Sequence, residues 1–336
     1  MDRDKLRVSV VGVGHLGKAH ARILSDLPGA RLVSVADVKA DTAREQGEKY
    51  GVPWTTDFHE IPGEPEAVCV VVPTKAHFLV ASWFLERGVH VLVEKPMAGT
   101  LEEADRLIEL ARERGLTLQV GHVERFNPIL AAVRDMGIRP RYMEAQRVAP
   151  FTFRSVDVGV VQDLMIHDLD IIFSLTGGGD VVDVEAFGGS VFTDKEDLAT
   201  ARLIFSSGEV AHLTASRVAL HPDRKFRLFA EDSYVSMDFG KKYGILIKKG
   251  PGWDRGKLDL SKIDPSRIGD LWKFVYEGLL TVKEIKAKDA EPLKEELLDF
   301  VRCVKTGDEP LVTGAQGRRA LKVAFEIEKA LRARPW

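Results

Sequence analysis

The sequence contains little cysteine, no long apolar run and almost no net charge, and each shortage excludes a class of protein. Two cysteines among 336 residues are too few for a disulfide framework or a cysteine metal cluster, so we expect Cys69 and Cys303 to be reduced packing residues. No apolar run reaches the roughly 18 residues of a membrane-spanning helix. A formal net charge of −3 without a long basic run offers no surface for nucleic acid or for an anionic membrane.

The remaining composition, 45% hydrophobic and 29% charged, is typical of a soluble globular chain of about two domains. The first apolar strand begins so close to the N-terminus that no room is left for the apolar segment of a signal peptide. We therefore expect a cytoplasmic protein.

A glycine motif between a strand and a helix is the clearest functional signal. The apolar stretch from Val8 to Val13 predicts a buried strand, and Gly12, Gly14 and Gly17 form G-x-G-x-x-G where that strand turns into a helix. In this motif the first glycine permits the tight turn, the second lets the backbone approach a pyrophosphate, and the third lets the helix pack closely. The first helical turn would then offer its N–H groups to the diphosphate.

An acidic residue follows at the spacing that a dinucleotide site requires. The second predicted strand, 31–36, ends at Asp37, whose carboxylate can accept both ribose hydroxyls of an adenosine and would repel a 2′-phosphate. A glycine triplet alone is often only a tight turn, but here strand, helix, second strand and acid occur in register. We therefore predict NAD as the cofactor, in preference to NADP.

Strands and helices alternate through the first third of the chain. The predicted strands 67–72, 89–93 and 116–120 are separated by helices at 76–87 and between Thr100 and Gly115. Connections of this length imply right-handed crossovers and a parallel, doubly wound sheet.

From Arg125 onward the pattern changes to short β runs with few helices. Turns at Ser207-Gly208 and Asp232-Ser233 predict a largely antiparallel sheet. Helices would cover one face, and a partner subunit is the expected cover of the other, which predicts a homodimer or homotetramer. The predicted fold is α/β plus α+β, and its parts are a Rossmann domain at 1–121, a mostly antiparallel open-faced sheet domain at 122–310, and a helix at 311–336 that packs back on the Rossmann domain.

Taken in order, the motifs resemble the Gfo/Idh/MocA oxidoreductase family, in which an N-terminal Rossmann domain precedes an open-faced sheet domain. The matching segments cover almost the whole chain and are VVGVGHLGKAH, Asp37, VVPTKAHF, VEKPMA, GHVERFNP, QDLMIHDLD and KTGDEPLVTGAQGRRAL. Where many members have G-G-x-x-x-D-x-G-x-H, this chain has GVVQDLMIH from Gly159 to His167, so the backbone near the substrate is less open. The RFNP and DLMIHD segments look more like members that oxidise the 3-hydroxyl of UDP-N-acetylglucosamine than like inositol or glucose dehydrogenases.

Lys95 follows a strand at the edge where open parallel sheets bind their ligands. The resemblance implies the role of the family's matching lysine, which lies beside the nicotinamide and is hydrogen-bonded to the substrate hydroxyl. Without the resemblance, Lys95 would be interpreted as a surface lysine held by the following proline. The Lys-Pro pair also raises the chance of a cis peptide bond before Pro96.

Asp163 and His167 lie about one turn apart on a predicted helix and therefore share a face, which Asp170 extends. An imidazole titrates near neutral pH, which suits a general base that takes the hydroxyl proton as hydride leaves the carbon, and the carboxylate would orient the ring. The structural alternative is an N-cap aspartate with a buried histidine, and metal ligation lacks a third ligand. We expect His167 and Lys95 to act on one oxygen beside the nicotinamide, without a metal.

Two further sets of residues complete the predicted site. The glycine turn and the strand-end loops are expected to line the cofactor groove through Gly12, Gly14, His15, Leu16, Gly17, Asp37, Pro73, Thr74, His77, Glu94, Lys95 and His122. Residues near the domain junction are expected to bind an anionic, diphosphate-bearing substrate, and they are Arg125, Asn127, Arg147 and Arg154 with Asp163 and His167. Any one arginine could instead form an ordinary ion pair, and His20 has no motif around it.

Together these features predict an NAD-dependent dehydrogenase that transfers hydride between nicotinamide and a secondary alcohol of a sugar or sugar nucleotide, with UDP-N-acetylglucosamine as the leading substrate. One alternative is a redox-assisted glycosidase, which would oxidise its substrate transiently and then return the hydride. A second alternative is an NAD(P)-binding sensor without turnover, and the presence of both Lys95 and His167 argues against it.

Overall fold

The computed structural model describes residues 5–152, 158–176, 179–250, 253, 269–334 and 336. The chain forms two compact units, one of Met1–Phe126 with Ala290–Phe325 and one of Asn127–Asp289 with Glu326–Trp336. The first boundary lies close to the expected one at residue 121. Residues 290–310 were expected in the second domain but belong to the first unit, whereas the segment from Glu326, expected to pack on the Rossmann domain, belongs to the second unit. No helix in the described part of the chain combines the length and apolar character that crossing a membrane requires.

The first unit contains a six-stranded parallel sheet. Its strands are β1 (Leu6–Val11), β2 (Ala30–Ala36), β3 (Trp54–Thr55), β4 (Ala67–Val70), β5 (His90–Glu94) and β6 (Leu118–Gly121). Their order is β3-β2-β1-β4-β5-β6, and every pairing is parallel. This is the predicted doubly wound arrangement, and its order reverses between β1 and β4, where open α/β sheets bind their ligands.

The strands of this sheet are buried on both faces, which is why the sequence shows nearly continuous apolar runs. Along β4, Ala67 contributes to one apolar cluster and Val68 to the other. The cluster that contains Ala67 is completed by α1 (His15–Leu24) and α8 (Pro292–Thr306). The cluster that contains Val68 is completed by α3 (His77–Glu86), α4 (Leu101–Arg114) and the start of α9 (Gly314–Ala333). The remaining helix, α2 (Ala40–Tyr50), packs beside β2 and β3. Phe300 of α8 is fully buried in the cluster that contains Ala67, which explains why α8 belongs to this unit. Cys69 and Cys303 are buried and free, as predicted.

The second unit contains an eight-stranded sheet that is mostly antiparallel, as predicted. Its strands are β7 (Tyr142–Val148), β8 (Val181–Gly189), β9 (Leu198–Phe205), β10 (Val210–Ser216), β11 (Asp223–Phe229), β12 (Ser233–Asp238), β13 (Tyr243–Lys249) and β14 (Leu280–Lys286). Their order is β14-β13-β12-β11-β7-β10-β9-β8, and β7 with β10 is the one parallel pair among them. The long connection between β7 and β10 permits this pairing, since only antiparallel neighbours can be joined by tight turns.

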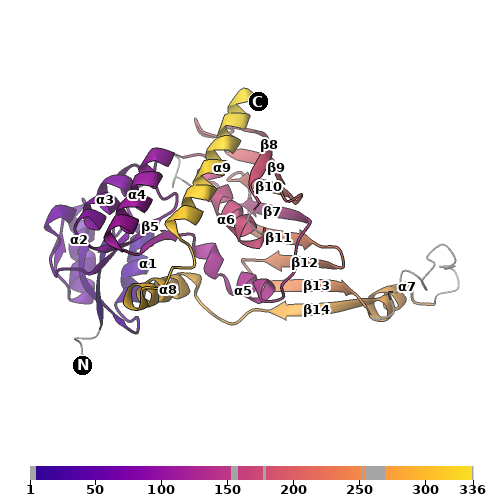
Figure 1. Cartoon of the computed structure of the whole chain (residues 1–336), viewed down its shortest axis with the longest axis horizontal. Coiled ribbons are helices and arrows are strands. Elements are labelled where there is room, and N and C mark those ends of the chain that lie inside the picture. Colours follow the sequence, from indigo (N-terminus) through magenta and orange to yellow (C-terminus); the bar gives the residue numbers. More distant parts are fainter. Residues whose placement is uncertain (1–4, 153–157, 177–178, 251–252, 254–268, 335) are drawn as a thin grey trace. The chain divides into compact units, whose positions relative to one another are not determined.

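Helices cover one face of this sheet. They are α5 (Pro128–Arg134) and the π-helical turn η4 (Val161–Met165) that continues into α6 (Ile166–Leu175). The short α7 (Leu271–Lys273) with its π-helical extension (Phe274–Leu279) lies instead at the end of the β13–β14 hairpin (Figure 1). Figure 1 shows α5 and α6 on the sheet, and β13 and β14 side by side as a long hairpin. Residues alternate in burial along β7, since Met143 and Ala145 are buried and Tyr142 and Glu144 are not. The sheet therefore has one face packed on helices and one face that this unit does not cover.

Replacing Gly17 by alanine tests the packing of α1 on the turn after β1. A Cβ at position 17 would lie 1.8 Å from the carbonyl oxygen of Gly12, so helix and turn would have to separate. Because overpacking of this kind costs about 1–3 kcal/mol, we expect Gly17→Ala to lower the free energy of unfolding in urea by that amount. Gly14→Ala is the matched control, since a Cβ there meets nothing within 4 Å. Equal stability of the two variants would contradict the packing role.

Candidate active site

The three glycines of the first turn differ in what surrounds them. Gly12 has a φ of +88°, and a Cβ on it would lie 2.3 Å from the carbonyl oxygen of Val71, beside β4. A Cβ on Gly17 would collide with the Gly12 carbonyl, whereas Gly14 faces open space. Gly12 and Gly17 thus allow α1 to begin directly behind β1, and Gly14 leaves the approach to the start of α1 clear.

The start of α1 fits the diphosphate of a dinucleotide. No side chain caps the helix at Gly14, no acidic residue occurs in its first turn, and His15 and Leu16 are exposed. The first N–H groups of a helix have no partner within the helix, and together with the helix dipole they favour an anion. The residues present therefore match an NAD diphosphate.

Asp37 is held in place by the glycine turn itself. Its Oδ2 accepts a hydrogen bond from the N–H of Val13 at 2.9 Å, and its Oδ1 accepts one from the N–H of Lys39 at 2.9 Å. Each carboxylate oxygen can accept a second hydrogen bond, so both could still receive a ribose hydroxyl. The geometry ties the acid at the end of β2 to the turn at the end of β1.

The segment after β4 contains Pro73, Thr74 and His77, and the His77 ring contacts backbone on either side of it. Pro73 is exposed, and Thr74 begins the short 3-10 helix η2 (Thr74–Ala76). The buried His77 ring lies between two backbone carbonyls, with Nδ1 2.7 Å from the Pro96 oxygen and Nε2 2.8 Å from the Val72 oxygen. Burial lowers the pKa of His77 despite these carbonyls, so the neutral ring donates one hydrogen bond and braces the turn after Lys95.

Lys95 is half buried, and its peptide bond to Pro96 is cis, as predicted. Burial, with added effects of Arg125 and Lys95, lowers the pKa of His122 to about 3. The charge of Lys95 contributes to the lowered pKa of His77 as well. Lys95 thus lies half buried at the start of the turn that His77 braces.

No role was predicted for His20, yet its ring is fully buried against Glu94. The distance from Nε2 of His20 to Oε1 of Glu94 is 2.9 Å, and Glu94 itself is 7% exposed. A Cβ on Gly121 would come within 2.8 Å of the same carboxylate, so the end of β6 also leaves room for it. The only signal in the sequence was that His20 falls on the apolar stripe of α1 with Leu24, where a histidine requires a partner.

Two of the residues predicted to bind substrate are buried and bonded to the protein. Arg125, in the 3-10 helix η3 (Val123–Phe126), is 4% exposed and donates from Nη2 to the Leu311 oxygen at 3.3 Å. Asn127 caps α5, because its Oδ1 accepts from the N–H of Ile129 at 3.2 Å, and its Nδ2 donates to the Phe239 oxygen at 3.3 Å. Both side chains hold the backbone of their own unit.

Arg147 forms a buried bidentate ion pair with Asp168. Its Nε and Nη2 donate to the two carboxylate oxygens at 3.0 and 2.7 Å. The side chains of Arg147 and Asp168 are 5% and 6% exposed. A bidentate contact of Arg147 with a substrate phosphate would require this pair to open. The pair fastens α6 to β7. Arg154 lies outside the described residues.

The helix that carries Asp163 and His167 begins with a π turn. Asp163 lies within η4 and His167 in the first turn of α6, and both side chains are half buried. The sequence predicted one regular helix here, and a π turn changes the angle between the two side chains, since its hydrogen bonds span five residues. Asp170, on the same helix, is almost fully buried. Lys95 belongs to the first unit and this helix to the second.

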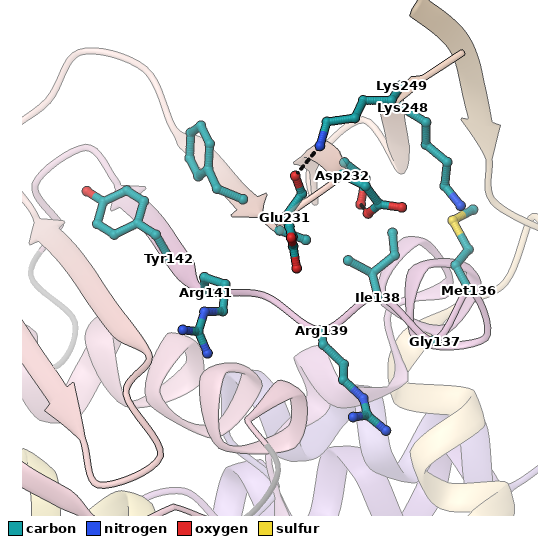
Figure 2. A pocket seen from close by; sticks show the side chains of 13 residues that line it. Met136, Gly137, Ile138, Arg139, Arg141, Tyr142, Glu231, Asp232, Lys248 and Lys249 are labelled. Carbon is teal, nitrogen blue, oxygen red and sulfur yellow. Dashed lines mark hydrogen bonds between the residues drawn. The ribbon is translucent and has the colours of Figure 1, made fainter. Parts of the chain in front are cut away.

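Figure 2 shows a separate hollow of about 1060 Å³ in the second unit. It lies around Tyr142, at the start of β7, whereas the Arg147–Asp168 pair lies near the other end of that strand. Its rim mixes Arg139, Arg141 and two lysines with Glu231 and Asp232, and the ammonium of Lys249 donates to the backbone oxygen of Glu231 at 2.9 Å (Figure 2). None of the predicted site residues that the structure describes lines it.

The sequence matches two family models. Residues 6–122 match the model described as an oxidoreductase family with an NAD-binding Rossmann fold, and residues 137–236 match the GFO/IDH/MocA C-terminal domain. The chain is 36% identical to the UDP-N-acetylglucosamine 3-dehydrogenase of Acidithiobacillus ferrooxidans over 98% of each chain, and a solved structure of that enzyme has a TM-score of 0.87.

More distant relatives share the same architecture. Identity to the myo-inositol 2-dehydrogenase of Thermotoga maritima is 28%, over 97% of this chain and 96% of the relative. A solved levoglucosan dehydrogenase in complex with NADH has the same fold, with a TM-score of 0.80 at 16% identity over 98% of this chain and 97% of that one. The motifs, the two sheets and these relatives agree, and the chain belongs to the Gfo/Idh/MocA oxidoreductase family, with an NAD-binding Rossmann fold in its first unit.

Proposed function

We propose that this protein is an NAD-dependent dehydrogenase that oxidises the 3-hydroxyl of UDP-N-acetylglucosamine. The observation that carries the substrate is the 36% identity, over 98% of both chains, to a relative named for that reaction. The start of α1 and Asp37 suit NAD, and Lys95 follows the carboxyl end of β5, on the edge of the sheet where such cofactors bind.

The roles of the side chains follow from the chemistry of alcohol oxidation. Bound NAD supplies the hydride acceptor. His167 takes the proton from the hydroxyl oxygen, Asp163 orients the imidazole, and Lys95 donates a hydrogen bond to the same oxygen and stabilises its developing negative charge. The hydroxyl carbon loses hydride and becomes a carbonyl carbon, so the proton and the electron pair are both accounted for.

The contacts of the predicted substrate arginines sharpen the substrate side of the proposal. Arg147 is engaged by Asp168 and Arg125 is buried, so we assign both to support of the site. Arg154 is then the arginine that we propose for the diphosphate, through the bidentate geometry that guanidinium groups offer to phosphate oxygens.

The assay that tests the function mixes the protein with NAD and a panel of UDP-N-acetylglucosamine, other sugar nucleotides, inositols and free sugars. We expect reduced nicotinamide to accumulate with UDP-N-acetylglucosamine, and the 3-keto sugar to be identified by mass spectrometry after borodeuteride reduction. Release of a free sugar without net NADH would indicate the redox-assisted glycosidase instead. Binding of the sugar nucleotide without any turnover would indicate a sensor.

Variants at Lys95 and His167 test the catalytic assignment. We expect Lys95→Met and His167→Asn each to lower kcat by about 10²–10⁴, the range typical of a lost general base or charge stabiliser. Because the two groups would act on one oxygen, the double variant should lose much less than the product of the two single effects. Lys75→Met, at an exposed lysine of η2, is the control. Full activity of Lys95→Met on every responsive sugar would contradict the assignment.

Asp37→Ala tests the preference for NAD. Loss of charged hydrogen bonds of about 1.5–3 kcal/mol should weaken NAD binding roughly tenfold to a hundredfold, and loss of the repelling charge should improve binding of NADP. Dissociation constants of both cofactors from fluorescence titration measure the change. Asp41→Ala, an exposed acid of α2 paired with Arg44, is the control. Unchanged selectivity of Asp37→Ala would defeat this reading of the acid.

We also propose that the uncovered face of the eight-stranded sheet binds a second copy of the chain. An aromatic row crosses four strands there, with ring centroids 4.9 Å apart from Tyr234 to Phe229, 5.4 Å to Tyr142 and 5.6 Å to His212. Beside it, Arg227 pairs with Glu144 at 3.3 Å. Apolar rings together with charges of both signs make a surface that can pair with itself about a twofold axis.

Phe229→Glu tests this interface, because it places a charge in the middle of the aromatic row. We expect the native protein to be a homodimer or homotetramer by size-exclusion chromatography with light scattering, and the variant to shift to a smaller species. Leu79→Glu changes a leucine that is 59% exposed on α3, and it should leave the assembly intact. Thermal unfolding of both variants checks that they are folded. A monomeric native protein would refute the proposal.

A further inference from the structure

The helix that carries Asp163 and His167 has an external cap at its start. The N–H of Val160 donates to the backbone oxygen of Glu196 at 3.0 Å, and the N–H of Val161 lies 3.3 Å from Oε1 of the same residue. The first N–H groups of a helix have no partner inside the helix, so one residue of the segment between β8 and β9 supplies acceptors for two of them. No local pattern in the sequence indicates this contact, because Glu196 lies more than thirty positions away.

Gly159 provides the space for this cap. A Cβ at position 159 would lie 1.7 Å from Oε1 of Glu196, so any side chain there would displace the carboxylate from the helix start. The carbonyl oxygen of Gly159 also accepts the helical hydrogen bond from the N–H of Asp163 at 3.0 Å. Glycine is therefore needed at this position for the fit of Glu196, and not for a left-handed backbone conformation.

A buried ion pair holds the cap and the helix start to one another. Asp197 is fully buried, and its Oδ2 accepts from the N–H groups of residues 191–193 at 2.7, 2.6 and 2.9 Å. Its Oδ1 lies 3.3 Å from Nε of Arg217, and Nη2 of Arg217 donates to the backbone oxygen of Val158. Burial raises the pKa of Asp197, but these hydrogen bonds outweigh burial and keep it below its ordinary value, so the carboxylate is charged. Arg217 therefore contacts both Asp197, which is next to Glu196, and Val158, which precedes the helix.

The first turn of the helix is irregular and makes a contact beyond the cap. It is π-helical from Val161 to Met165, a geometry that is rare and occurs mostly as single turns at functional sites. Besides the cap, Gln162 in this turn donates from Nε2 to Oε1 of Glu328 at 2.7 Å. Asp163 lies within the π turn and His167 directly follows it, so contacts that hold the turn also set where these two side chains point.

We propose that Glu196 is a positioning residue for His167 and Asp163, acting through its cap on the first turn of their helix. This inference rests on the proposed function, in which His167 takes the hydroxyl proton. Proton transfer is sensitive to position, since misplacement of a reacting group by about 1 Å can lower a rate by about 10². Loss of the cap should therefore lower kcat for the sugar nucleotide and leave the KM for NAD unchanged, because the cofactor residues belong to the other unit.

Variants at Glu196 separate positioning from folding. Glu196→Ala removes the side-chain acceptor, and we expect kcat per folded active site to fall about tenfold to a hundredfold. Glu196→Gln keeps an oxygen that can accept from Val161, and we expect it to retain at least about half of the native kcat. Thr313→Ala is the matched control, since it removes a cap bond of the same 3.3 Å length at the start of α9. It should lower thermal stability without lowering kcat.

A double variant tests whether Gly159 acts through Glu196. Gly159→Ala alone should reproduce the loss of Glu196→Ala, because the added methyl group displaces the carboxylate. In Gly159→Ala with Glu196→Ala the colliding atoms are gone, so kcat should equal that of Glu196→Ala alone. Multiplied losses in the double variant would overturn the proposal, as would a native kcat in Glu196→Ala or an equal loss in Glu196→Gln.

Hydrogen exchange provides a readout that does not depend on activity. We expect the peptide spanning residues 158–167 to exchange faster in Glu196→Ala and in Gly159→Ala, but not in Glu196→Gln. Faster exchange in a protein whose native form oxidises no sugar would refute the proposed function and leave the cap standing. Native exchange and native kcat in Glu196→Ala, in a protein whose activity depends on Lys95, would refute the cap and leave the function standing.

Discussion

The first unit depends on the contact between Gly17 of α1 and the carbonyl oxygen of Gly12. Because no side chain intervenes, α1 begins directly behind β1 and its first N–H groups lie at the carboxyl end of the sheet. The same turn is tied to both neighbouring strands. Gly12 donates from its N–H to the Ala36 oxygen at 2.7 Å, and Val13 donates to Asp37, while Val71 at the end of β4 lies against Gly12. One close approach thus brings together the start of α1 and Asp37, the groups that we propose bind the diphosphate and the ribose of NAD.

Buried polar side chains hold the segments around Lys95 in place, which is unusual for a loop at the end of a strand. His77 braces the turn that follows the lysine, His20 is held against Glu94, and His122 is kept neutral by burial. Each of these side chains would be costly to bury without a partner, and a half-satisfied network would weaken the fold. The arrangement explains how a lysine on a strand-end loop can have a defined position.

In the second unit, buried ion pairs hold the helix that carries His167. The Arg147–Asp168 pair joins α6 to β7, and the Asp197–Arg217 pair joins the start of η4 to the segment beside Glu196. Both pairs are buried and hydrogen-bonded, which is the condition under which buried charges hold a geometry firmly. The helix that carries His167 is therefore held at its start and at Asp168. The sequence had suggested a substrate contact for Arg147, which instead supports this helix.

The sequence by itself determined the fold class, the family and the position of the dinucleotide motif, because these depend on local patterns. Apolar runs, glycine spacing and the acid after β2 are read from neighbours in the chain, and strands, helices and the family followed from them. Strand β14 was not predicted from the sequence, and α8 was assigned to the second domain instead of the first unit. Both depend on packing between segments far apart in sequence.

Only the tertiary structure decided which partners the polar side chains have. Arg147, Asn127, His77 and His20 are of types that could bind a ligand, and their bonds to distant backbone and side-chain atoms could not be read from spacing. The cap on the π turn that holds Asp163 likewise comes from Glu196, more than thirty residues away. Periodicity encodes burial along one element, whereas hydrogen-bond partners depend on how elements meet in space, and that is why the contacts that hold these side chains could not be predicted from the chain alone.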